Sequence, residues 1–139
     1  QKDYQQTVVV RRMVEDLNMD VDIVVCPTLR EEDGLAMSSR NAYLGEDERR
    51  AAAVVYRTLT RASEMIRQGN TTPEAVGRGM HEMLRSEPLV TEVQYAGVYD
   101  AGTLEPTTEL RKAILLAIAL LLGKTRLIDN MVIECVPKN

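Results

Sequence analysis

The chain has 139 residues, with 17 Lys and Arg against 21 Asp and Glu, so its net charge is −4 and its length suits one domain or slightly more. Hydrophobic residues at 45% and charged residues at 27% exclude a disordered chain, and the acidic balance argues against a nucleic-acid-binding protein. The most apolar run, Ala113–Leu122, is shorter than the ~20 residues that a membrane-spanning helix needs. We therefore expect a globular cytoplasmic protein with neither a nucleic-acid nor a membrane partner.

The first segment is predicted to form a helix and then a strand. Residues 4–18 place Val10, Met13, Val14 and Leu17 at helical spacing. Asp3 precedes them and is expected to cap the first turn through its carboxylate. The run Val21–Cys26 is nearly all apolar and ends at Pro27, which is typical of a strand buried on both faces. A helix followed by such a strand is half of an α/β unit.

Residues 28–45 show no hydrophobic periodicity, and a loop of this length usually has a function. It contains Met37-Ser38-Ser39-Arg40-Asn41, in which two adjacent hydroxyls and a guanidinium offer the donors that a polyphosphate needs. The alternative is a surface turn capped by Ser and Asn side chains. We place the first candidate site here.

A helical pair is predicted next. Glu46–Gln68 carries acidic residues in its first turn and is closed by Gly69, with an apolar face of Ala51, Val55, Leu59, Ala62 and Ile66. Thr72 and Pro73 begin a second helix, which stops before Pro88 and carries Val76, Met80, Met83 and Leu84 on one face. Because the link is short, we expect the two helices to pack against each other.

The last third is predicted to be mainly β. Val93, Tyr95 and Tyr99 alternate with other residues up to a turn at Asp100-Ala101-Gly102. Ala113–Leu122 fits a buried strand or a buried helix, and Arg126–Val136 is predicted to be a strand. Antiparallel strands beside a helical pair make an α+β fold. Two isolated cysteines, Cys26 and Cys135, are interpreted as buried free thiols.

A second candidate site lies at Gln1-Lys2-Asp3-Tyr4-Gln5-Gln6. Free amides at the start of the predicted helix favour an anion, and Lys2 adds a positive charge. Gln6 both donates and accepts hydrogen bonds, which suits a ligand bearing a carboxylate and a hydroxyl. The alternative is a solvated polar segment.

Together these segments resemble the pantothenate synthetase family. The resemblance runs through the whole chain, in the family's order and spacing, and is carried by Lys2–Gln6, Pro27–Glu31, Asp33–Asn41 and Thr125–Asn130. The serine-arginine stretch is also the family's counterpart of the KMSKS loop of class I aminoacyl-tRNA synthetases. The resemblance implies that residues 1–27 are the last helix and strand of a Rossmann-like nucleotide-binding domain and that residues 28–139 form an α+β lid domain. Since the sequence opens on Gln1 without Met, we expect a piece of a longer protein.

The resemblance also implies a reaction, in which ATP activates pantoate as a pantoyl adenylate and β-alanine displaces AMP. Lys2, Ser38, Ser39 and Arg40 are then the catalytic set, Gln6 holds pantoate, and Mg²⁺ bridges phosphate oxygens without a dedicated metal site in the protein. Several residues are implied to bind ATP: Gln1, Lys2 (phosphates), Asp3 (ribose), Leu29 (adenine), Met37, Ser38, Ser39 and Arg40.

The sequence also departs from the family. The HxGH phosphate-binding motif is absent, because the only histidine, His81, lies among the apolar residues of a predicted helix and is interpreted as structural. Gly45 stands where the family more often has a capping Ser or Thr. We expect the chain alone to be inactive, the complete enzyme to be a homodimer, and Val21–Cys26 to pair with a partner chain. Two alternatives stay open: a non-catalytic α+β interaction or regulatory module, and a fragment of another nucleotidyl-transfer enzyme.

Overall fold

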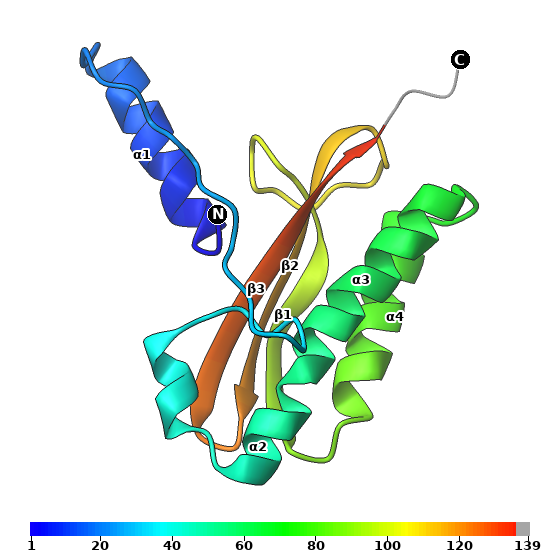
Figure 1. Ribbon diagram of the computed structural model, residues 1–139. Helices are drawn as coiled ribbons and strands as arrows, with labels where there is room; N and C mark the ends of the chain where they lie inside the picture. Colours follow the sequence, from blue (N-terminus) through cyan, green and yellow to red (C-terminus); the bar gives the residue numbers. More distant parts are fainter. Residues whose placement is uncertain (136–139) are drawn as a thin grey trace.

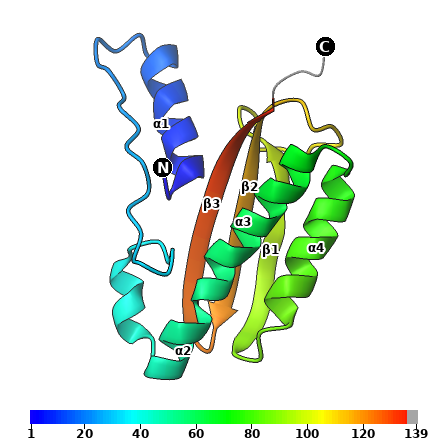
Figure 2. The same cartoon turned by 45° about the vertical axis from the view of Figure 1, so that its right-hand side comes forward.

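The computed structural model describes residues 1–135, and it is an α+β fold built on one antiparallel sheet. The strands β1 (Val90–Asp100), β2 (Lys112–Leu122) and β3 (Thr125–Cys135) lie in that order, so each hydrogen-bonds to the next along the chain. Helices α3 (Ala53–Gln68) and α4 (Pro73–Arg85) cover one face of the sheet, as Figures 1 and 2 show. The predicted α+β fold, with antiparallel strands packed against a helical pair, is therefore confirmed.

The central strand explains why the run from Ala113 could be assigned to a strand or to a helix. Its even-numbered side chains, from Ile114 to Leu122, face the helices and are fully buried. Leu115 and Ala119, on the other face, are also buried. A strand covered on both faces is apolar throughout and loses the alternation that identifies an exposed strand.

The helical pair follows the predicted pattern with one difference. The apolar face of the first helix is buried, Gly69 ends that helix at φ +78°, and the Thr72 hydroxyl caps α4 by accepting from the Ala75 amide at 3.2 Å. The single helix predicted over residues 46–68 is instead two consecutive helices, α2 (Glu46–Ala51) and α3. Between them the Ala52 carbonyl accepts from the Val55 amide, which tightens one turn to 3₁₀ spacing.

The segment before the lid differs most from the prediction. Helix α1 (Tyr4–Asp16) forms but buries none of its residues, and it lies away from the face that α3 and α4 cover (Figure 1). The strand predicted at Val21–Cys26 is wrong, since these residues form no strand and Val24 is 82% exposed. A strand needs a hydrogen-bonded neighbour, and no described segment pairs with this one. A Rossmann-like arrangement is thus not seen in the described residues.

Smaller corrections concern the loops and ends. The Asp3 carboxylate makes no capping hydrogen bond, although Asp3 occupies the N-cap position of α1. The loop expected at 28–45 contains a short 3₁₀ helix, η1 (Ser39–Tyr43). Both cysteines are free, as expected, but neither is fully buried: Cys26 is exposed because the strand expected to bury it does not form, and Cys135 is half-buried. The predicted end of the last strand, Val136, lies outside the described residues. Among those residues no helix is long and apolar enough to cross a bilayer.

Candidate functional site

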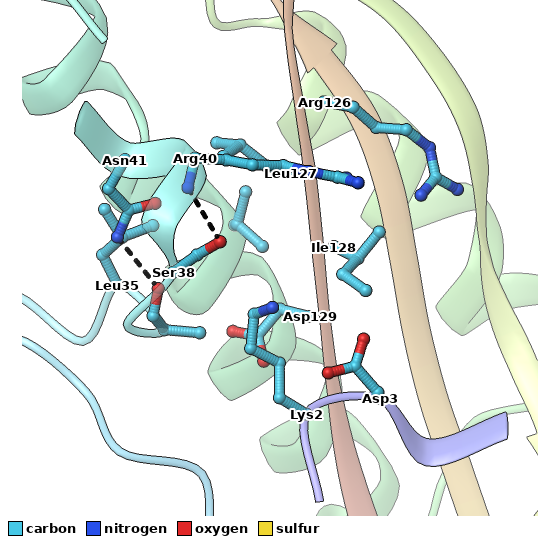
Figure 3. A pocket seen from close by; sticks show the side chains of 12 residues that line it. Lys2, Asp3, Leu35, Ser38, Arg40, Asn41, Arg126, Leu127, Ile128 and Asp129 are labelled. Atoms are coloured by element: carbon cyan, nitrogen blue, oxygen red, sulfur yellow. Dashed lines mark hydrogen bonds between the residues drawn. The ribbon is translucent and has the colours of Figure 1, made fainter. Parts of the chain in front are cut away.

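The two candidate segments meet at one cavity of about 240 Å³. Its walls come from the start of α1, from the loop around η1, and from β3, so that Lys2, Asp3, Ser38, Arg40 and Arg126 share one space. Figure 3 shows these side chains around the cavity, with Lys2 and Asp3 at the α1 side and Ser38 and Arg40 at the η1 side. Two stretches far apart in the sequence are thus brought together.

The η1 wall is held by local hydrogen bonds. The Ser38 Oγ accepts from the Arg40 amide at 3.2 Å, and the Asn41 side-chain amide donates to the Ala36 carbonyl at 3.1 Å (dashed in Figure 3). The Ser38 cap starts the 3₁₀ turn, which makes Arg40 part of the cavity wall. The capped surface turn considered as an alternative therefore exists, and it is part of the cavity wall.

The α1 wall presents free backbone amides. The first intrahelical bond runs from the Thr7 amide to the Asp3 carbonyl, and the Asp3 carboxylate caps none of the amides before it. The residues that carry these amides, Tyr4, Gln5 and Gln6, line a second cavity that adjoins the first, and Lys2 lines both cavities. The positive end of the helix dipole and the Lys2 ammonium favour negative charge at this point.

The cavity favours anions overall. Three cationic side chains line it, those of Lys2, Arg40 and Arg126, and among the described residues none of the three takes part in an ion pair. Of its two carboxylates, that of Asp129 is already bound by Arg30 at 2.6 Å. An excess of unpaired cations in a concave site of this size suits a phosphate chain.

A second cavity of about 420 Å³ adjoins the first, sharing Lys2, Asp3 and Arg126 with it. It lies between the start of α1 and the sheet face that α3 and α4 leave free, and Gln6 lines it together with Tyr95 and Tyr99. Burial raises the pKa of the Tyr99 phenol, and the neighbouring Tyr95 raises it further. The surface that lines this cavity is more apolar than that of the first, and Gln6 is one of several hydrogen-bonding side chains in it.

Several predicted residues lie outside both cavities. Gln1, Leu29, Met37 and Ser39 line neither of them, and the side chains of Leu29 (73% exposed) and Met37 (48% exposed) face solvent. The structure therefore does not bring these four residues together with Lys2, Ser38 and Arg40 in either cavity.

A polar network behind the cavity was missed in the sequence. Arg30 binds the Asp129 carboxylate at 2.6 and 3.1 Å, and Asn130 donates to the Gln1 and Lys2 carbonyls at 3.1 and 2.6 Å. The available signal was the adjacent pair Asp129-Asn130 in the middle of β3, with apolar residues on both sides. Their partners are 99 and 128 residues away in the sequence, so no local pattern identifies them.

This fold and site define an α+β protein with a cavity that is lined by cationic side chains at the start of a separate helix. The family model for pantoate–β-alanine ligase matches residues 1–132, and the chain belongs to that family. A pantothenate synthetase of Thermodesulfovibrio yellowstonii is 56% identical over 134 residues, which are 96% of this chain and 48% of that protein. The chain therefore spans about half the length of the curated relatives it matches.

Solved structures agree with this assignment. The pantothenate synthetase of Thermus thermophilus superposes with a TM-score of 0.88 at 42% identity, covering 94% of this chain and 46% of that one. The pantoate–β-alanine ligase of Francisella tularensis, complexed with β,γ-ATP and β-alanine, has a TM-score of 0.57 at 29% identity and covers 94% and 41%.

Proposed function

We propose that this chain forms the lid side of the ATP site in a ligase that joins pantoate to β-alanine. The observation that carries the proposal is the single cavity that gathers Lys2, Ser38 and Arg40 from two distant segments. Family membership supports the reaction, and the ATP and β-alanine bound by the Francisella tularensis relative support the substrates. Three positive charges around one cavity fit a triphosphate better than they fit a non-catalytic interaction module.

The chemistry proceeds in two displacements. A carboxylate oxygen of pantoate attacks the α-phosphorus of ATP, the bond to the bridging oxygen breaks, and pyrophosphate leaves. The β-alanine amine then attacks the carbonyl carbon of the pantoyl adenylate, AMP leaves, and the amine gives up its proton. Both steps depend on positioning and charge neutralisation, with no covalent attachment to the protein.

The residues of the first cavity serve the phosphates in this proposal. Lys2 and Arg40 neutralise the charge that develops on pyrophosphate, Ser38 donates a hydrogen bond, and Asp3 binds the ribose hydroxyls. Ser39, the next residue outside the cavity, donates a further hydrogen bond to the phosphates in this proposal. Mg²⁺ bound to the nucleotide would neutralise part of the phosphate charge and would need no dedicated ligand from the protein.

The other proposed substrate contacts lie outside the first cavity. Gln6 holds pantoate in the adjoining cavity, which places the pantoate carboxylate next to the phosphate site. Leu29 and Met37 cover the adenine outside the cavity, and Gln1 completes the nucleotide contacts. We further propose a cytoplasmic homodimer for the complete enzyme. The chain alone is inactive in this proposal, because half of the length of its relatives lies outside it.

The test is AMP release from ATP, pantoate and β-alanine. The chain alone is expected to give no turnover, and the same chain fused behind the first half of the Thermodesulfovibrio yellowstonii relative is expected to restore it. In that fusion Arg40→Ala should lower kcat/KM by about 10²–10³-fold, since it removes charge stabilisation from the transition state. Arg61→Ala, on the exposed face of α3, is the matched control and should have no effect. Turnover by the chain alone, or full activity of the Arg40→Ala fusion, would contradict the proposal.

A further inference from the structure

The Asn130 amide joins the sheet to the cavity lysine. Asn130 lies on β3 and is 6% exposed, and its Nδ2 donates to the Lys2 carbonyl at 2.6 Å and to the Gln1 carbonyl at 3.1 Å. Both acceptors belong to the backbone from which the Lys2 side chain projects. The position of the ammonium therefore depends on a side chain of the lid.

Asn130 is itself fixed by its neighbours. Its backbone amide donates to Asp129 Oδ1 at 2.8 Å, and its carbonyl accepts from Arg30 Nη2 at 3.4 Å. The Asp129 side chain is only 2% exposed and is held by both Arg30 nitrogens. Bidentate guanidinium–carboxylate pairs have a defined geometry, so Asn130 is attached to a rigid point of the sheet.

The same guanidinium also fixes the other wall of the cavity. Arg30 donates to the Gly34 carbonyl at 3.0 Å, lies 4.5 Å from the centre of the Tyr56 ring, and pairs through its backbone with Ala36. Ala36 leads directly into the segment of Ser38 and Arg40. The hydrogen-bond network of Arg30, Asp129 and Asn130 thus connects both walls of the proposed phosphate cavity to the same two residues of β3.

The chemistry of Asn130 indicates a purpose other than stability. Its Oδ1 is buried and has no hydrogen-bond partner among residues 1–135, which costs free energy. The neighbouring positions on the same strand face carry Ile128 and Val132, so an apolar side chain suits this surface. What the amide adds is the pair of hydrogen bonds to the Lys2 segment.

We propose that Asn130 is a positioning residue that acts through Lys2, holding its ammonium where the triphosphate of ATP binds. This rests on the proposed function. Asn130 has no contact with the phosphates in the proposal, and its effect on ATP affinity therefore vanishes once the Lys2 ammonium is removed.

The experiment measures binding of ATP and of AMP to the chain itself, by calorimetry. Asn130→Ala should weaken ATP binding about tenfold, as expected for the loss of two hydrogen bonds, and leave AMP binding unchanged. Lys2→Ala should weaken ATP binding at least as much, and the double variant should bind no more weakly than Lys2→Ala alone. Val132→Ala is the matched control, since Val132 lies two residues further along β3 on the same strand face, and this variant should bind ATP like the wild-type chain.

A second measurement keeps the inference independent of the proposed function. Backbone order parameters from nuclear magnetic resonance should fall at Lys2 and Asp3, from about 0.85 to below about 0.6, in Asn130→Ala and not in Val132→Ala. If the wild-type chain binds no ATP, the proposed role in nucleotide binding fails for this chain, and these order parameters still decide the inference. Additive losses of ATP affinity in the double variant, or unchanged order parameters in Asn130→Ala, would overturn it.

Discussion

Gly34 permits the close contact between the loop and α3 that the Arg30 network needs. Its φ is +89°, a conformation that strains any L side chain, and a Cβ built there would lie 1.9 Å from the Tyr56 ring. The ring cannot move away freely because Arg30 is stacked on it. Gly34→Ala is therefore expected to lower the free energy of unfolding by roughly 2–3 kcal/mol, measured by urea denaturation.

A second glycine provides the control for this prediction. Gly77 lies within α4, and a Cβ added there would meet nothing within 4 Å. Gly77→Ala should raise the free energy of unfolding by about 0.5–1 kcal/mol, because alanine loses less backbone entropy in a helix. A Gly34→Ala chain as stable as the wild type would show that the loop does not sit against α3 in this way.

Asp33 links the same loop to α2 in a pH-dependent manner. Its carboxylate accepts from Arg49 at 2.5 and 3.2 Å, and this hydrogen bonding, chiefly, lowers the pKa of Asp33 below its usual value. A lowered pKa in the folded state gives stability that is present above the unfolded-state pKa and is lost as the pH falls through the folded-state value. The loss is therefore expected below about pH 4.

The corresponding variant is Asp33→Asn. Because the two side chains are 37% and 35% exposed, water screens the pair and its contribution is expected to be only about 0.5 kcal/mol at pH 7. Unfolding free energies of Asp33→Asn and the wild type should differ at pH 7 and converge at about pH 2. A difference that stays constant from pH 7 to pH 2 would exclude the ion pair as its cause. Glu64→Gln, in the exposed pair with Arg61, should change stability little at pH 7.

At the scale of elements, the start of α2 is only half capped. The Glu48 side chain accepts from the Gly45 amide at 3.0 Å, but glycine has no side-chain oxygen to accept from the Glu48 amide in return. Gly45 has φ −65° and ψ 168°, which any residue can adopt. Gly45→Ser should complete the reciprocal pair and raise the free energy of unfolding by a few tenths of a kcal/mol, about 0.3.

Alanine at the same position separates capping from backbone effects. Gly45→Ala has the reduced backbone freedom of serine without its hydroxyl, and it should be less stable than Gly45→Ser by about 1 kcal/mol in urea denaturation. Equal stability of the two variants would mean that the hydroxyl does not cap α2.

At the scale of the whole molecule, local patterns identified most elements whose partners lie within the chain, although they left Ala113–Leu122 open between a strand and a helix. The helical pair and its end at Gly69 follow from spacing, caps and glycine positions, and the strands pair in sequence order. The strand predicted at Val21–Cys26 was wrong for the opposite reason. An apolar run indicates that a segment can form a buried strand, but it does not show that neighbouring strands are present. The residues proposed to bind phosphate were visible as motifs, whereas Asp129 and Asn130 act through contacts 99 and 128 residues away along the sequence.

The two parts of the chain should therefore differ in how they open. The core joins α3, α4 and all three strands, whereas α1 buries no residue and is attached to the lid by polar contacts such as Tyr4 Oη to the Ala101 carbonyl and Arg12 to the Gly102 carbonyl. We propose a division near Pro27 on this basis. Native-state hydrogen exchange should show α1 amides opening at a small fraction of the global free energy and β2 amides opening only with global unfolding.

Denaturant provides the sharper form of this test. The opening free energy of β2 amides should fall with urea along the global slope, and that of α1 amides should be nearly independent of urea, because local opening exposes little new surface. Leu59→Ala, which removes a fully buried core side chain, should lower the β2 values by about 2–5 kcal/mol and leave the α1 values almost unchanged. If α1 shared both the slope and the response to Leu59→Ala, residues 1–27 would be part of the same cooperative unit as the lid.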